Sequence, residues 1–101
     1  MGKVGLFVAL QAKPGKEEDV EKFLRSALPL VNSEPGTVSW YAIRHPDSAT
    51  FGIFDTFRDE AGRQAHLSGK VAEALFAKAP ELFSRPPEVQ KLEILTEKKS
   101  A

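Results

Sequence analysis

The 101-residue sequence has no cysteine, which excludes disulfide bonds, thiolate-bound zinc or iron–sulfur centres and thiol nucleophiles. It has no charge surplus either, because 14 basic side chains balance 14 acidic ones, so electrostatic attraction to nucleic acid or to an acidic membrane is not expected. No apolar run approaches the roughly 20 residues of a membrane span, and the first residues lack the apolar stretch of a signal peptide. We therefore expect a cytoplasmic protein without nucleic-acid or membrane partners.

Histidine is scarce, with only His45 and His66, and no carboxylates stand at metal-ligand spacing around either one. Gly62 and Gly69 are isolated, so the sequence has no glycine-rich loop for a phosphate or dinucleotide, and it contains no G-x-S-x-G motif. The sequence therefore predicts no bound metal and no cofactor.

What is present is the composition of a single folded domain, with 42% hydrophobic and 28% charged residues. Apolar segments rich in strand formers are separated by segments with apolar residues at helical spacing. The predicted elements are strands at 4–12, 37–44, 50–57 and 88–96, a helix at 16–32, and a broken helical region from Asp59 to about Pro80.

This order, βαββαβ, predicts a ferredoxin-like α+β fold in which a four-stranded antiparallel sheet carries both helical layers on one face. Neither a sequence repeat nor a linker divides the chain, so residues 1–101 form one domain. We expect the tail at 97–101 to be frayed.

The predicted sheet is apolar on both faces. Alternation in the third strand places Phe51, Ile53 and Phe57 on the helix-covered side and Phe54 on the other, and we place Trp40 of the second strand on the uncovered side with Phe54. Because two helices cover only one face, a second copy of the chain is predicted to cover the other, giving a dimeric α/β barrel. The alternative is a monomer whose strands twist around one core.

Two titratable residues are candidates for chemistry. Asp55 shares the covered side with apolar residues, so its carboxylate must be paired, hydrogen-bonded or neutralised, either as a proton acceptor in a pocket or as a structural partner of an arginine, Ser39 or a backbone amide. His66 has an ordinary pKa near 6.5 and is either an acid–base residue or a packing or capping residue.

An ordered set of short motifs extends over most of the chain. These are P-G-K-E-E at 14–18, E-P-G-T at 34–37, F-G-I-F-D-T-F at 51–57, D-E-A at 59–61 and H-L at 66–67. In this order the motifs resemble the antibiotic biosynthesis monooxygenase domain family. The resemblance implies a ferredoxin-like fold that dimerises through its sheet faces.

The resemblance also implies an activity: a cofactor-independent monooxygenase that oxidises a quinol-like or polycyclic phenolic molecule with O2. In that reading His66 is the catalytic base, Asp55 is its orienter or the alternative base, and Phe7, Phe51 and Phe57 form the aromatic wall of the substrate pocket. Phe57 stands where many members have tryptophan, so an aromatic surface is kept but an N–H donor is lost.

Two other functions remain open at this stage. The same base would serve an isomerase that transfers a proton without oxygen, and a dimer of this kind would also serve as a non-enzymatic small-molecule-binding or stress-associated protein. Oxygen dependence of turnover separates the first alternative from a monooxygenase, and ligand binding without turnover identifies the second.

Overall fold

The computed structural model describes residues 4–98 and has the predicted ferredoxin-like arrangement. The predicted helix at 16–32 and the central strands are confirmed, with small differences at element ends. The elements are β1 (Val4–Gln11), α1 (Glu17–Asn32), β2 (Thr37–Arg44), β3 (Thr50–Phe57), α2 (Glu60–Leu67), α3 (Lys70–Leu82) and β4 (Glu88–Glu93).

In the first half of the chain β1 ends one residue early and α1 begins one residue late, and the larger differences lie in the second half. The strand predicted at 88–96 ends at Glu93, and α3 continues past the expected stop at Pro80 as far as Leu82. Proline removes one helical hydrogen bond, but the extra turn buries Leu82, and the Phe83 N–H still donates to the Ala79 carbonyl at 2.9 Å. Of the tail expected to fray, residues 99–101 lie outside the described part of the chain.

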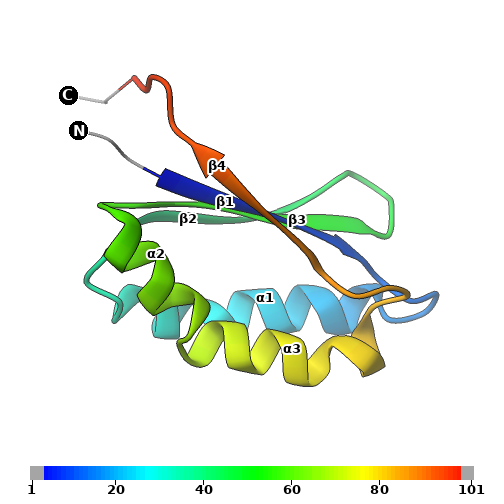
Figure 1. Cartoon of the computed structure of the whole chain (residues 1–101). Coiled ribbons are helices and arrows are strands. Elements are labelled where there is room, and N and C mark those ends of the chain that lie inside the picture. The colour runs from blue at the N-terminus through cyan, green and yellow to red at the C-terminus, as the bar shows by residue number, and fades with distance from the viewer. Residues whose placement is uncertain (1–3, 99–101) are drawn as a thin grey trace.

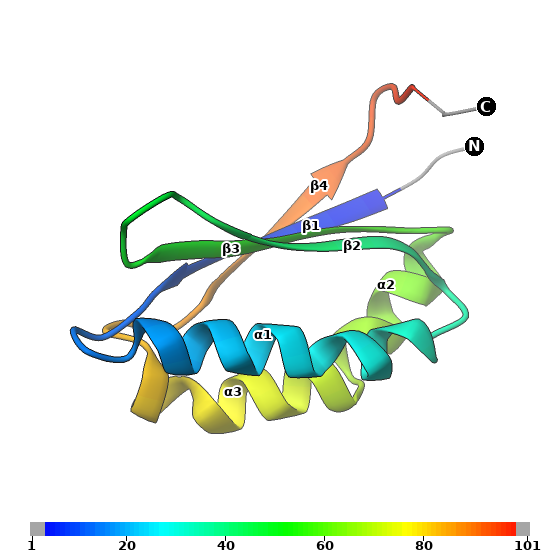
Figure 2. The ribbon, with the colours of Figure 1, turned by 180° about the vertical axis from the view of Figure 1, so that it is seen from behind.

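The four strands form one antiparallel sheet in the order β2-β3-β1-β4. Figures 1 and 2 show α1 and α3 side by side beneath the sheet and α2 under the end where β3 finishes, and no helix of residues 4–98 lies on the opposite face. One face of the sheet is therefore covered by this chain, and we call the other the open face.

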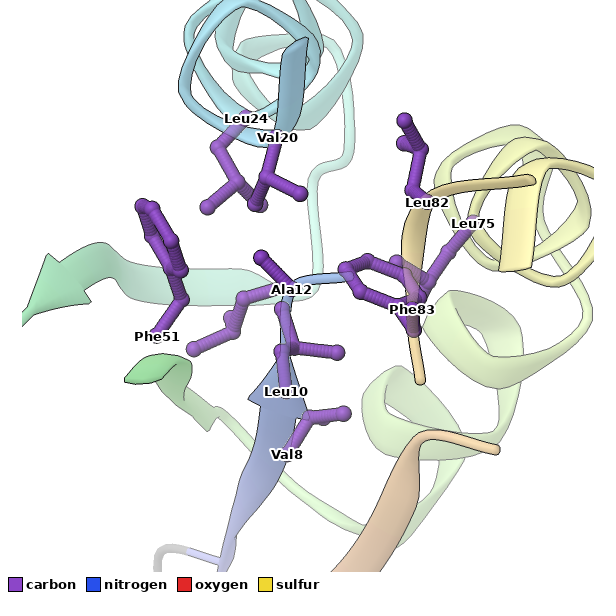
Figure 3. Packing of buried hydrophobic residues seen from close by; sticks show 10 residues of the cluster. Val8, Leu10, Ala12, Val20, Leu24, Phe51, Leu75, Leu82 and Phe83 are labelled. Carbon is purple, nitrogen blue, oxygen red and sulfur yellow. The ribbon is translucent and has the colours of Figure 1, made fainter. Parts of the chain in front are cut away.

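The main core lies between the sheet and the long helices, as Figure 3 shows. Alternate residues of β1 point toward side chains of α1 and α3, and Phe51 of β3 closes one side. Because this packing fixes β1 and β3 against the helices, it also fixes which residues of β3 face inward. The labelled members are Val8, Leu10, Ala12, Val20, Leu24, Phe51, Leu75, Leu82 and Phe83.

The structure corrects the placement of Trp40. In the β2–β3 register Trp40 lies opposite Asp55 and Tyr41 lies opposite Phe54, so Trp40 faces the helices and Tyr41 occupies the open face. The phase of β2 relative to β3 depends on the pairing register and on an irregularity between Thr37 and Ser39, which breaks the regular alternation at the start of β2.

The open face is nevertheless apolar. Tyr41 and Ile43 are 57% and 42% exposed, and the ring of Tyr41 stacks on that of Phe54 with centroids 6.5 Å apart. Phe7, opposite Phe54 in the β1–β3 register, extends the same surface.

Candidate functional site

His66 is held beneath the sheet by the way α2 is anchored. Asp59 caps the helix by accepting a hydrogen bond from the Gly62 N–H at 2.9 Å. One turn before His66, the buried Arg63 donates to the carbonyls of Gly5 and Leu92, which ties α2 to β1 and β4. His66 therefore lies at the buried side of a rigidly attached helix, with its side chain 8% exposed.

A close contact between two glycines brings the α1–β2 loop against α2. A Cβ atom on Gly62 would lie 2.9 Å from the Gly36 carbonyl oxygen, and one on Gly36 would lie 2.8 Å from the Gly62 Cα. The Arg58 N–H donates to that same Gly36 carbonyl at 3.1 Å. Because neither backbone leaves room for a side chain, the loop that carries Glu34 approaches His66.

Three side chains meet at this point, one from the loop, one from α2 and one from β3. His66 Nδ1 lies 2.6 Å from Glu34 Oε1, and His66 Nε2 lies 3.1 Å from Asp55 Oδ2. Thr37 donates its hydroxyl to the same Glu34 oxygen at 2.8 Å. The side chains are 20% exposed at Glu34, 8% at His66 and 1% at Asp55, so the group runs from the surface to the interior.

Burial and the two carboxylates shift the acid–base properties of the site. Burial raises the pKa of Asp55 above its ordinary 3.8, and the neighbouring His66 only partly opposes this. For His66, burial acts to lower the pKa, but the contacts with Asp55 and Glu34 outweigh it and hold the pKa above 6.5. Asp55 and His66 thus retain a proton between them more readily in the folded protein than free side chains do.

The raised pKa values of Asp55 and His66 predict that the free energy of unfolding falls as the pH rises above 6.5. Because the pKa of His66 is higher in the folded than in the unfolded protein, proton binding stabilises the fold at pH values below the unfolded-state pKa. This stabilisation is lost as the pH rises through the pKa of His66 in the folded protein. The pKa of Asp55 is also raised by folding, so its contribution to stability likewise decreases with rising pH. The loss reaches at most about 1.4 kcal/mol per pH unit for each proton. Urea unfolding between pH 6 and 9 measures this loss of stability. His66→Gln should reduce the dependence of the unfolding free energy on pH, whereas His45→Gln, at an exposed position, is the control.

Two clefts lie near the site: His66 lines the smaller one, and neither His66 nor Asp55 lines the larger one. The α1–β2 cleft, of about 520 Å³, has walls that include Leu24, Leu28, Trp40 and Phe51, with Arg44 above the Phe51 ring at 4.9 Å from its centroid. The loop cleft, of about 410 Å³, has walls formed by the α1–β2 loop and the start of α2, and both Glu34 and His66 line it. The larger cleft therefore supplies the apolar surface and the smaller one gives access to the titratable group.

Trp40 links the larger cleft to Asp55, a connection that the sequence prediction missed. It lines that cleft, packs against the core, and lies directly opposite Asp55 in the register, so the two side chains share a face of the sheet. Within residues 4–98, the buried indole N–H lacks a hydrogen-bond partner, and the polar contact of Asp55 is its ion pair with His66 at 3.1 Å. An indole donor is thus present in the interior although position 57 is phenylalanine.

The three phenylalanines predicted to form one wall are placed in three different environments. Phe57 is fully buried and contacts His66, with ring centroids 5.1 Å apart. Phe51 lies six residues earlier on the same strand, roughly 20 Å away, and lines the α1–β2 cleft. Phe7 lies on the open face, because its β1 neighbours Leu6 and Val8 point into the core.

Glu34 is the other group that sequence reasoning missed. It stood within the quoted motif at 34–37, but no rule of spacing connects a loop carboxylate to a histidine 32 positions later. Its contact depends on the two glycines, whose close approach is a tertiary feature.

The arrangement is suited to proton transfer. A buried carboxylate next to an imidazole is able to accept a proton from a hydroxyl group bound beside it. Across residues 4–98, no group of three or more His, Asp or Glu side chains is arranged to hold a metal ion. In the same part of the chain, no helix is long and apolar enough to cross a bilayer.

Comparison with known proteins identifies the family and the fold of the chain. A family model described as antibiotic biosynthesis monooxygenase matches residues 4–78. A protein of unknown function from Nitrosomonas europaea has 54% sequence identity and a TM-score of 0.93, with coverage of 100% of this chain and 97% of that chain. No curated protein sequence matches.

More distant structures share the fold. A Mycobacterium tuberculosis protein has 20% identity and a TM-score of 0.85, with 96% of this chain and 99% of that chain covered. A candidate antibiotic biosynthesis monooxygenase from Caulobacter crescentus has 18% identity and a TM-score of 0.81, with 94% and 92% covered. At these identities the similarity concerns the fold.

Proposed function

The chain belongs to the antibiotic biosynthesis monooxygenase family, and on that premise we propose that it oxidises a quinol-like or polycyclic phenolic molecule with O2. The observation that supports this most directly is the buried pair of His66 and Asp55, 3.1 Å apart: His66 lines the loop cleft, and Trp40, opposite Asp55 in the strand pairing, lines the α1–β2 cleft. Such a pair can take a phenolic proton, and the electron-rich phenolate is the species that reacts with oxygen.

The chemistry requires a base and a site from which water is excluded. The ring hydroxyl loses its proton to the pair, and the phenolate passes an electron to O2. One oxygen atom then bonds to a ring carbon to form a quinone, and the other leaves as water with two hydrogens of the substrate. Neither flavin nor metal takes part in the proposed step, in keeping with a sequence that has no glycine-rich nucleotide loop.

Each residue has a role in this proposal. Asp55 is the acceptor of the substrate proton, since its carboxylate is buried with Oδ2 3.1 Å from His66 Nε2, and His66 shares that proton through Nε2. The aromatic ring of the substrate occupies the α1–β2 cleft against Phe51 and Trp40, while Phe57 packs against the ring of His66. Phe7 takes no part in this wall, because it lies on the other face.

Oxygen consumption by chelator-treated protein tests the proposal. With a panel of naphthols, anthrones and quinols, we expect uptake well above the autoxidation rate and a quinone product detectable by chromatography. Heat-denatured protein and catalase additions control for autoxidation. Turnover that continues without oxygen would indicate an isomerase, and binding without turnover would indicate a binding protein; either result refutes the monooxygenase.

We also propose that the chain forms a homodimer through the open face. No helix of residues 4–98 covers Tyr41, Ile43 or Phe54, and exposed aromatic and aliphatic side chains that adjoin one another are unusual on a soluble monomer. A second copy of the same face would bury them and add to the modest core that a 101-residue chain can form.

Charge on the open face is expected to separate the two chains. Tyr41→Glu and Ile43→Glu introduce a carboxylate that would be buried without a partner in the dimer, so sedimentation at micromolar concentration should change from the mass of two chains to that of one. Phe76→Glu is the matched control, since Phe76 is 48% exposed on α3 in the helical layer. A wild-type mass of one chain would refute the dimer.

A further inference from the structure

We propose that Glu34 is a positioning residue: it holds the His66 ring by Nδ1 so that Nε2 faces Asp55. The inference rests on the proposed function for its catalytic consequence, but the geometry that carries it stands independently. Glu34 belongs to neither α1 nor β2, and its contact with His66, at 2.6 Å between Oε1 and Nδ1, joins the α1–β2 loop to α2.

The contact defines the orientation of the imidazole. A carboxylate only accepts hydrogen bonds, so the proton between Glu34 and His66 belongs to Nδ1, and Nε2 is left to exchange a proton with Asp55. Thr37 donates to the same Glu34 oxygen at 2.8 Å and therefore fixes the carboxylate in turn. The chain of contacts thus runs from Thr37 through Glu34 and His66 to Asp55.

Among the charged side chains around His66, Glu34 is the one that contacts Nδ1 of the ring. Asp55 is the one charged residue of β3, and it faces the other nitrogen of the ring. On α2 itself, Arg63 is engaged by Glu60 and by two backbone carbonyls. The remaining charged neighbours are exposed: Arg58 and Asp59, which line the loop cleft, and Lys70 at the start of α3.

Direct observation of the imidazole tests the inference without any substrate. The chain has two histidines, so ¹⁵N-detected NMR of the wild type and of His45→Gln assigns the His66 signals. In Glu34→Gln we expect the His66 titration midpoint to fall and the preference for a protonated Nδ1 to weaken, because a neutral amide attracts the imidazolium less and can rotate to present its NH2 group. Glu18→Gln is the charge-matched control on the first turn of α1, roughly 21 Å along the helix from its end.

A second pair of variants keeps the charge constant. Thr37→Val removes the hydroxyl that fixes Glu34 and should shift the His66 midpoint in the same direction by less, whereas Thr37→Ser keeps the hydroxyl and should match the wild type. With an active substrate, Glu34→Gln should lower kcat by roughly 10- to 100-fold at nearly constant KM.

The outcomes are distinct. An unchanged His66 midpoint and tautomer preference in Glu34→Gln overturns the inference, as does full kcat in a variant whose imidazole signals have moved. If the signals move as expected and the wild type turns over no substrate, the positioning contact stands and the proposed oxidation is the part that fails.

Discussion

Replacing Gly62 by alanine is expected to lower the free energy of unfolding by roughly 1 to 3 kcal/mol. Helix propensity alone predicts the opposite change, because alanine is more favourable than glycine in a helix by about 1 kcal/mol. The added Cβ would lie 2.9 Å from the Gly36 carbonyl oxygen, and this neighbour is backbone rather than a flexible side chain. Relief requires the α1–β2 loop to move away from α2, and that movement lengthens the contact between Glu34 and His66.

Chemical denaturation of Gly62→Ala and Ala61→Gly measures the two effects separately. Ala61 is exposed on the same helix, so Ala61→Gly reports helix propensity and should cost about 1 kcal/mol. In Gly62→Ala the His66 titration midpoint should also fall, since Glu34 is then farther away. A Gly62→Ala protein more stable than the wild type would show that the glycine contact does not constrain the loop.

The elements of the fold follow from local sequence patterns. The acidic first turn and apolar spacing at 16–32 form α1, and the runs at 37–44 and 50–57 form β2 and β3 with the predicted bounds. These patterns depend on periodicities of 3.6 and 2, which a sequence displays directly. The covered side of β3, including the inward position of Asp55, was predicted for the same reason.

Relations between elements were harder to predict. The phase of β2 against β3 depends on pairing register, and without it Trp40 was assigned to the open face rather than to the site. Phe7 and Phe51 illustrate the same difficulty, since aromatic character does not reveal which face or which end of the sheet a residue occupies. Pairing Glu34 with His66 requires the approach of two glycine backbones, which no local pattern encodes.

Asp55→Asn is expected to lower the oxidation rate by about 10² to 10⁴-fold, the usual contribution of a positioned base. Asparagine has nearly the same shape but does not accept the substrate proton. The effect on stability should be small, on the order of 1 kcal/mol or less, because the lost ion pair with His66 is offset by removing a carboxylate whose burial already raises its pKa. A large loss of rate without a matching loss of stability distinguishes a proton acceptor from a structural partner.

His66→Gln and the double variant complete this prediction. If Asp55 and His66 act as one proton-sharing unit, each single substitution should remove most of the rate and the double substitution little more, as expected for residues whose effects are not additive. The pH–rate profile, measured with an oxygen electrode, should also lose the inflection caused by titration of Asp55 and His66 in either single variant. Independent, multiplying losses in the double variant would mean that the two side chains serve separate steps, and wild-type rates in Asp55→Asn would assign the base to a different group.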